Sequence, residues 1–248
     1  MNHASHTTRR LLGTGATAAA ISALMLAAPA AATGGFQGTA NVVNPGTATV
    51  FQNPAADTMV ISAPQAVINW RPDDTTGTGT IDFLPQGNVV NFIGTGDYVV
   101  LNRIIPVDGS NVPIARLIAL NGQINATNGA ITGGSVWFYS PGGILVGQNA
   151  AINVGSLVLS SRDIDTTGGL FGAGGEIRFR DPGLAGANSA AITIAPGATI
   201  TTTSGGPAGS NFVALVAPRI EQAGRINADG SVALVAAEVA DITFNQGL

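Results

Sequence analysis

The run Val213-Ala214-Leu215-Val216-Ala217 returns as Val232-Ala233-Leu234-Val235-Ala236, at an offset of 19 in the numbering. Small and β-branched aliphatic residues of this kind favour strands. A second motif, approximately small–any–Ile–Asn/Thr–small, occurs in four places: 122–126, 150–154, 197–201 and 224–228. Measured between their isoleucines, successive copies are offset by 28, 48 and 26 in the numbering, so the chain carries a loose internal repeat.

These repeats predict a parallel β-helix, a β-solenoid in which each coil pairs its strands with the coils on either side. One coil cannot bury its own apolar face, but stacked coils can. A coil of about 20 residues with variable turns would give roughly ten coils. Short strands at regular spacing also fit an antiparallel sandwich or barrel. The close return of a near-identical strand, from Val213 to Val232, favours the solenoid.

The composition of the 248-residue chain fits this all-β interpretation. Hydrophobic residues make up 45% and charged residues only 10%, which excludes disorder by composition. There is no cysteine and no lysine, and all ten basic residues are arginine. Disulfides and thiolate metal sites are therefore excluded.

Residues 1–32 predict a secretory signal peptide. Arg9 and Arg10 supply its positive region, an uncharged apolar run extends from Leu11 to Leu26, and A-x-A sites allow cleavage after Ala30 or Ala32. The apolar run is too short for a membrane span, which needs about 20 residues. No later segment reaches that length, so we expect export without an integral membrane span. The paired arginines leave Sec and twin-arginine export both open.

Removal of the leader removes both histidines, His3 and His6, and leaves eight arginines against fourteen acidic residues, a net charge of −6. Nucleophilic catalysis usually needs a basic partner, and zinc sites nearly always use His or Cys. An acidic surface also disfavours nucleic acid, whose binding depends on phosphate neutralisation. We therefore expect no enzyme, metal site, cofactor or nucleic-acid partner.

Acidic residues that could act on a glycan remain as candidates. They are Asp73 with Asp74, Asp163 with Asp165, and Glu176 with Arg178 and Arg180. Turn positions explain them better, because aspartate side chains bond to nearby backbone. The segment 163–165 lacks the glycine-rich repeat of calcium-binding rolls, and 172–175 is interpreted as a flexible turn.

Three aromatic residues stand together at Trp137-Phe138-Tyr139. Alternation along a strand places Trp137 and Tyr139 on one face and Phe138 on the other. We expect Phe138 in the core, and the other two beneath a surface hairpin or, less commonly, over a groove.

The domain division expected is a leader at 1–32, an N-terminal cap at 33–75 and a β-helix at 76–248. A cap is needed because a solenoid's first coil exposes an unpaired edge. The strand-and-turn pattern still runs at Leu248, so we expect the sequence to be a fragment or its last coil to pair with another element.

Residues from about 36 to 162 resemble the secretion domain of two-partner-secretion exoproteins, the filamentous haemagglutinin type. The resemblance rests on four features in order: Val67-Ile68-Asn69-Trp70, Val100-Leu101-Asn102-Arg103-Ile104, Leu120-Asn121-Gly122-Gln123-Ile124, and Ser140-Pro141-Gly142-Gly143-Ile144-Leu145-Val146-Gly147. The run 152–158 is similar to the strand that follows in the family. Both asparagines of the family's signature are absent from this turn, so the side-chain amides that they would offer for recognition are missing.

The resemblance implies a right-handed parallel β-helix with a capping segment. It also implies recognition in the periplasm by an outer-membrane barrel transporter with POTRA domains, then folding at the cell surface as an adhesin or toxin carrier. The residues implied in recognition are Asn102, Arg103, Ser140, Pro141, Gly142, Gly143 and Ile144. Two alternatives remain: an adhesive or structural surface β-helix binding host, biofilm or matrix components, and a β-helical polysaccharide-cleaving enzyme.

Overall fold

The structure is a computed structural model that describes Met1 and residues 34–203 and 211–244. All described strands lie in the compact unit Ala32–Leu248. The predicted leader falls almost entirely outside the described residues, so it stays a prediction. Among the described residues, no helix is long and apolar enough to cross a membrane.

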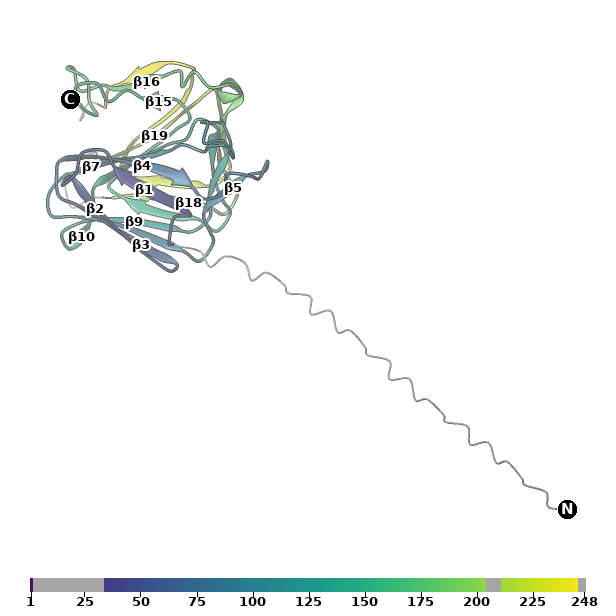
Figure 1. Ribbon diagram of the computed structural model, residues 1–248. Coiled ribbons are helices and arrows are strands. Elements are labelled where there is room, and N and C mark those ends of the chain that lie inside the picture. Colours follow the sequence, from purple (N-terminus) through teal and green to yellow (C-terminus); the bar gives the residue numbers. More distant parts are fainter. Residues whose placement is uncertain (2–33, 204–210, 245–248) are drawn as a thin grey trace. The chain divides into compact units, whose positions relative to one another are not determined.

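Three sheets, each pairing successive coils in parallel, form the body of this unit (Figure 1). The β4 sheet contains β4 (Gln65–Pro72), β7 (Val99–Ile104), β11 (Ser135–Tyr139), β14 (Ser156–Ser160), β19 (Asn211–Ala217) and β22 (Gly230–Ala236). The β3 sheet contains β3 (Ala56–Ile61), β6 (Val89–Gly94), β9 (Gln123–Asn128), β13 (Ala151–Val154), β18 (Thr199–Thr202) and β21 (Arg225–Ala228), with β10 (Ile131–Thr132) at its side. The β5 sheet contains β5 (Ile81–Leu84), β8 (Ile118–Leu120), β12 (Gly143–Val146), β17 (Ala191–Ile194) and β20 (Arg219–Gln222).

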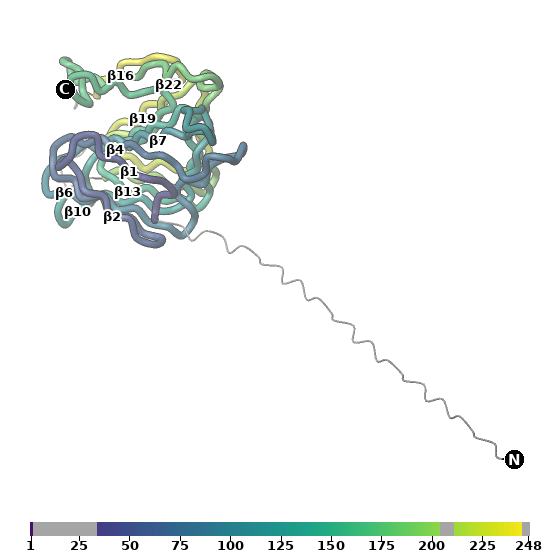
Figure 2. The backbone as a smooth tube through the Cα atoms, viewed as in Figure 1, coloured from purple at the N-terminus to yellow at the C-terminus, as the bar shows by residue number. Residues whose placement is uncertain are grey.

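The chain visits the three sheets in turn, and this confirms the parallel β-helix (Figure 2). The two copies of the aliphatic run lie in direct register, with Val213 opposite Val232. Ile124, Ile152, Ile200 and Ile226 of the second motif also stack in one column. The sequence spacings of both motifs are thus the lengths of single coils.

The predicted coil length of about 20 residues, and with it the count of roughly ten coils, is wrong for most of the helix. Within the described residues, six parallel strands stack in the β4 sheet. The steps from Ser135 to Ser156 and from Asn211 to Gly230 come close to the predicted length. Other coils are longer because loops lengthen their corners, such as the segment between Ile104 and Ile118.

The N-terminal end of the helix is covered by antiparallel strands and an aromatic plug. β1 (Gly38–Val42) pairs antiparallel with β4, and β2 (Ala48–Asn53) pairs antiparallel with β3. Phe36 lies beneath them, its ring stacked 4.7 Å from that of Phe83 and edge-on to Trp70. The buried carboxylate of Asp57 holds this plug by accepting the backbone N–H groups of Gly35 and Phe36, each at 2.8 Å. A capping layer is therefore present, formed by β1 and β2, whereas the predicted domain boundary at residue 75 stays a prediction.

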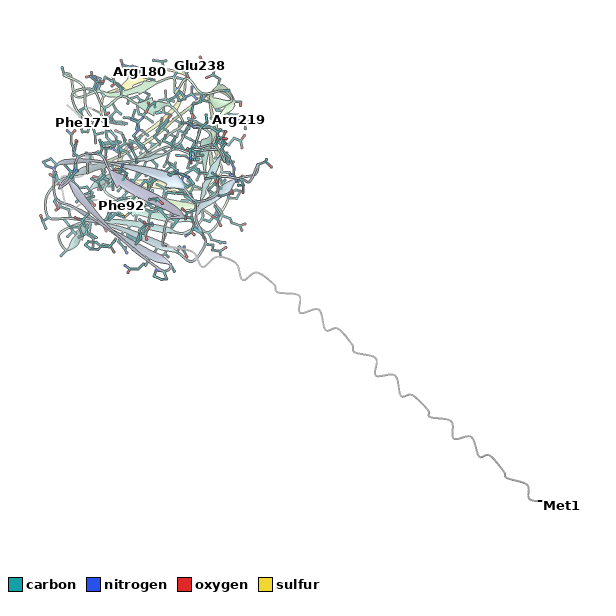
Figure 3. All side chains as sticks on the ribbon, in the orientation of Figure 1. Met1, Phe92, Phe171, Arg180, Arg219 and Glu238 are labelled. Atoms are coloured by element: carbon teal, nitrogen blue, oxygen red, sulfur yellow. The ribbon has the colours of Figure 1, made fainter. Side chains whose placement is uncertain are left out.

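The interior is a single apolar column formed by alternate residues of the three sheets. Phe92 and Phe138 are both fully buried in it, and Phe92 is labelled within the body in Figure 3. At the other end, Val232 and Leu234 continue the stack of strands but are about half exposed, at 48% and 50%. The expectation that a further element pairs there stays a prediction.

A second apolar cluster lies outside the helix, beneath an insertion at residues 161–190. The insertion contributes β15 (Asp163–Ile164), β16 (Ile177–Arg180) and the 3-10 turn η1 (Ala187–Ser189); β23 (Ala240–Ile242) completes its small antiparallel sheet. Figure 1 shows β15 and β16 in a layer beyond β4 and β7. Trp137 and Tyr139 are buried under this layer, and the ring of Phe171 packs edge-on against Trp137 at 5.2 Å. The structure confirms the core position of Phe138 and the hairpin over its two neighbours.

Candidate functional site: a polar groove beside the predicted recognition residues

A groove of about 890 Å³ lies between the outer face of the β4 sheet and the insertion. Its lining comes from strands of this sheet and from loops, because the insertion reaches back over the first coils. The lining residues are Thr39, Asn41, Val43, Asn44, Gln65, Val67, Asn69, Trp70, Arg71, Arg103, Ile105, Val107, Thr166, Gly169 and Leu170.

Strand alternation explains why β4 forms the floor of the groove. Ala66, Ile68 and Trp70 point into the apolar interior, where each is at most 3% exposed. The side chains between them, those of Gln65, Val67, Asn69 and Arg71, therefore point outward. Two of these outward residues, Asn69 and Arg71, bring polar groups to the groove.

Two polar contacts hold the insertion against this floor. Gln65 Oε1 accepts the backbone N–H of Leu170 at 2.9 Å. Arg103 Nη2 lies 2.8 Å from Asp163 Oδ1, and its guanidinium stacks over the ring of Tyr139, 5.5 Å from the centroid. The wall of the groove is thus tied to both β4 and β7.

The groove lining mixes apolar residues with polar ones, and its polar side chains are either neutral or positively charged. No aspartate or glutamate is among its lining residues. Arg103 is neutralised by Asp163, whose pKa is raised by burial, an effect that the nearby Arg103 opposes. Arg71 is exposed and has no ion-pair partner within the described part of the chain. Asn69 Oδ1 is buried without a hydrogen-bond partner. The groove therefore offers a cation without an ion-pair partner among the described residues.

Asn102, one of the predicted recognition residues, lies inside the helix. It is fully buried, and its Oδ1 accepts the indole N–H of Trp70 at 3.0 Å. Its Nδ2 donates to the carbonyl of Trp137 at 3.3 Å. The side chain thus ties the first three strands of the parallel β4 sheet together from within, since these partners lie in β4 and β11.

The predicted recognition turn is packed between neighbouring coils. The N–H of Gly143 donates to the carbonyl of Ser140 at 3.0 Å, so Ser140-Pro141-Gly142-Gly143 is a β-turn with proline at its second position. A Cβ on Gly142 would overlap the backbone of Arg116, and one on Gly143 would overlap the carbonyl oxygen of Ala191. Ile144 is fully buried in the apolar interior.

The structure brings the predicted recognition residues to one corner of two adjacent coils. Asn102 and Arg103 lie opposite Phe138 and Tyr139, and Ser140 follows directly. Of the whole set, only Arg103 lines the groove. Most of the set is inaccessible in the folded protein.

The candidate glycan-cleaving acids are engaged in structural contacts. Asp74 pairs with Arg116 at 2.5 Å, Asp165 with Arg178 at 3.5 Å, and Glu176 Oε2 accepts the N–H of Gly174 at 2.9 Å. Arg180 pairs with Asp241 at 2.5 Å. Within the described residues, no cluster of three or more potential ligands could hold a metal ion. The segment 172–175 is a turn, closed by the N–H of Gly175 on the carbonyl of Gly172.

Sequence reasoning did not identify the groove. One feature of the sequence could have indicated it. Asn69 and Arg71 are polar residues at alternate positions of β4, which indicates that the outer face of this strand is not packed against an apolar layer. The other wall comes from the segment around Leu170, far along the chain. No local sequence pattern predicts that this segment contacts β4.

No family model and no curated protein matches the sequence. Among solved structures, the chain is similar to the crystal structure of the HMW1 secretion domain from Haemophilus influenzae, with a TM-score of 0.61 and 22% sequence identity. The match covers 84% of this chain and 46% of that one, so the chain spans less than half the length of the structure it resembles. This similarity supports the β-helical fold.

Proposed function

We propose that this chain is the secretion domain of a two-partner exoprotein or adhesin, recognised in the periplasm by an outer-membrane transporter and folding at the cell surface. The observation that supports it most is the fold, a capped parallel β-helix similar to a solved secretion domain. That solved structure is described as a secretion domain, which fits a chain without chemistry of its own.

The burial of the predicted recognition residues indicates at which stage of secretion the transporter would bind them. Asn102 and Ser140 are fully buried, and both glycines of the turn are packed against backbone. A transporter can contact them only before the coils stack. We therefore place recognition on the unfolded chain, where an extended segment can add a strand to the edge of a POTRA sheet.

The same residues would then serve folding. Asn102 links Trp70 to Trp137, and this contact assembles the first coils around the aromatic plug. The N-terminal coils would thereby form a template on which later coils add their strands, since each coil needs a neighbour to bury its apolar face.

Secretion of a reporter fused after the domain tests this proposal, with the full chain coexpressed with its transporter. Ser140→Ala is the sharpest variant, because Ser140 Oγ is buried without a hydrogen-bond partner and its loss should leave stability unchanged. We expect Ser140→Ala and Asn102→Ala to reduce secretion. Asn125→Ala is the matched control, since that side chain lies on the outer face of β9.

Direct binding separates recognition from folding. The periplasmic part of the transporter should bind the urea-unfolded chain after dilution and should not bind the folded chain. Equal binding of folded and unfolded chain, or normal secretion of both variants, would refute the recognition proposal.

A further inference from the structure

The groove over β4 has the features of a ligand site that the secretion proposal does not use. Its volume of about 890 Å³ lies within the usual range for small-molecule sites, roughly 300–1,000 Å³. Its walls are fixed by the contacts of Gln65 with Leu170 and of Arg103 with Asp163. The site is therefore formed in the folded, exported protein rather than in the chain during transport.

The lining chemistry selects the class of ligand. Its neutral polar side chains are amides and hydroxyls, groups that suit a ligand rich in hydroxyls, which both donate and accept hydrogen bonds. They are Thr39, Asn41, Asn44, Gln65, Asn69 and Thr166. Val67 and Ile105 supply apolar surface between them. This combination of polar and apolar lining residues matches a saccharide, because a sugar ring carries hydroxyls around its edge and C–H groups on its two faces.

The charge of the groove adds a second requirement. Arg71 is the one guanidinium of the described lining without a carboxylate partner, since Arg103 is paired with Asp163. A free guanidinium presents a planar fork that matches a carboxylate in bidentate fashion. The lining contains no acid that would repel such a group. Asn69 lies on the same strand and also lines the groove, so its side-chain amide can hydrogen-bond a ligand hydroxyl.

We propose that the groove between β4 and the insertion binds an acidic saccharide, with a sugar carboxylate on Arg71 and a sugar hydroxyl on Asn69. This gives the exported domain a binding activity of its own, independent of transporter recognition. The recognition variant Ser140→Ala leaves the groove untouched, because Ser140 is not among the lining residues.

Calorimetry of the folded protein with oligogalacturonate tests the proposal. Methyl-esterified oligogalacturonate is the matched probe, because it has the same sugar without the charge. We expect the wild-type protein to bind the acid at least about tenfold more tightly than the ester, which is the effect of one charge-assisted hydrogen bond. Arg71→Gln should weaken acid binding by a similar factor and should not weaken ester binding.

Two further variants complete the design. Arg219→Gln removes the same charge from an exposed residue of β20, which Figure 3 shows on the side away from Phe171, and it should leave both affinities unchanged. Asn69→Ala should weaken acid and ester equally, because it removes hydroxyl recognition alone. The absence of acid binding, equal affinity for acid and ester, or an equal loss in Arg219→Gln would overturn the proposal.

Discussion

Gln65 and Leu170 are joined by a hydrogen bond of 2.9 Å across 105 residues of chain. Gln65 begins β4 in the first coil, whereas Leu170 belongs to the insertion that follows β14 in the fourth. The insertion therefore spans the outer face of the β4 sheet and fastens a late coil to the first.

Gln65→Ala should lower the free energy of unfolding by about 1 kcal/mol, because the buried N–H of Leu170 loses its acceptor. Urea denaturation followed by circular dichroism measures the change. Gln123→Ala is the matched control, since Gln123 is exposed on β9 in the β3 sheet, and it should stay within about 0.5 kcal/mol of wild type. An equal loss of unfolding free energy in both variants would show that the hydrogen bond between Gln65 and Leu170 does not contribute to stability.

Gly143→Ala should cost about 3 kcal/mol or more, from two physical causes. Its φ of +98° disfavours any side chain, and a Cβ would overlap the carbonyl oxygen of Ala191. Gly168→Ala isolates the first cause, because Gly168 has a φ of +81° and open space around it, and should cost about 1 kcal/mol. Equal unfolding free energies for the two variants would contradict the close packing of the turn between coils.

Asp74 should stabilise the fold fully above about pH 4 and progressively less below it. The side-chain hydrogen bond from Arg116 lowers the pKa of Asp74 to about 2 from an ordinary value of 3.8. A lowered folded-state pKa gives stability that is present above the unfolded-state pKa and is lost as pH falls from about 4 towards 2. Because the Asp74 side chain is 43% exposed, we expect about 1 kcal/mol after screening.

The test of this pH dependence is the difference in unfolding free energy between wild type and Asp74→Asn. That difference should be near its full value at pH 6 and should shrink between pH 4 and pH 2. Asp229→Asn, at an exposed position just after β21, serves as the control. A difference independent of pH would rule out the ion pair as its cause.

Phe179→Ala should loosen the insertion and leave the helix intact. Phe179 is fully buried in the outer cluster, whereas Phe92 is fully buried in the interior column. Truncation of a buried phenylalanine lowers the free energy of unfolding by about 3–5 kcal/mol. We expect Phe179→Ala to destabilise the insertion and Phe92→Ala to destabilise the helix, because each residue belongs to a different cooperative unit. Hydrogen exchange should rise in 163–180 and 240–242 for Phe179→Ala and throughout the strands for Phe92→Ala. Uniform acceleration in Phe179→Ala would mean that insertion and helix unfold together.

The fold could be predicted because β-helical coils repeat their strands in register. Val213 and Val232 stack directly, so two copies of one run in the sequence are neighbours in the structure. The unequal spacings between copies of the isoleucine motif, from Ile124 to Ile226, are also coil lengths. The period was underestimated because the corner loops vary in length and carry no periodic signal.

The site could be predicted only in part. Alternation along β11 placed Trp137 and Tyr139 on the outer face, and turn chemistry explained Asp165 and Glu176. The contacts that form the groove, Gln65 with Leu170 and Arg103 with Asp163, join segments far apart in the chain. Such pairs depend on how coils of unequal length superpose, which local patterns do not specify. Whether a transporter reads Asn102 and the Ser140 turn stays a prediction.

The return of the insertion to β4 also affects how fast the protein folds. Closing a loop of about 100 residues carries an entropic cost that must be met before its contacts form, and folds rich in such distant contacts reach the native state slowly. The first three coils need only their immediate neighbours to pair their strands. The hydrogen bond of Gln65 can form only after the chain as far as Leu170 has folded back over β4. We therefore expect the contact between Gln65 and Leu170 to form late in folding, so that its loss would raise the unfolding rate of the domain more than it lowers the folding rate.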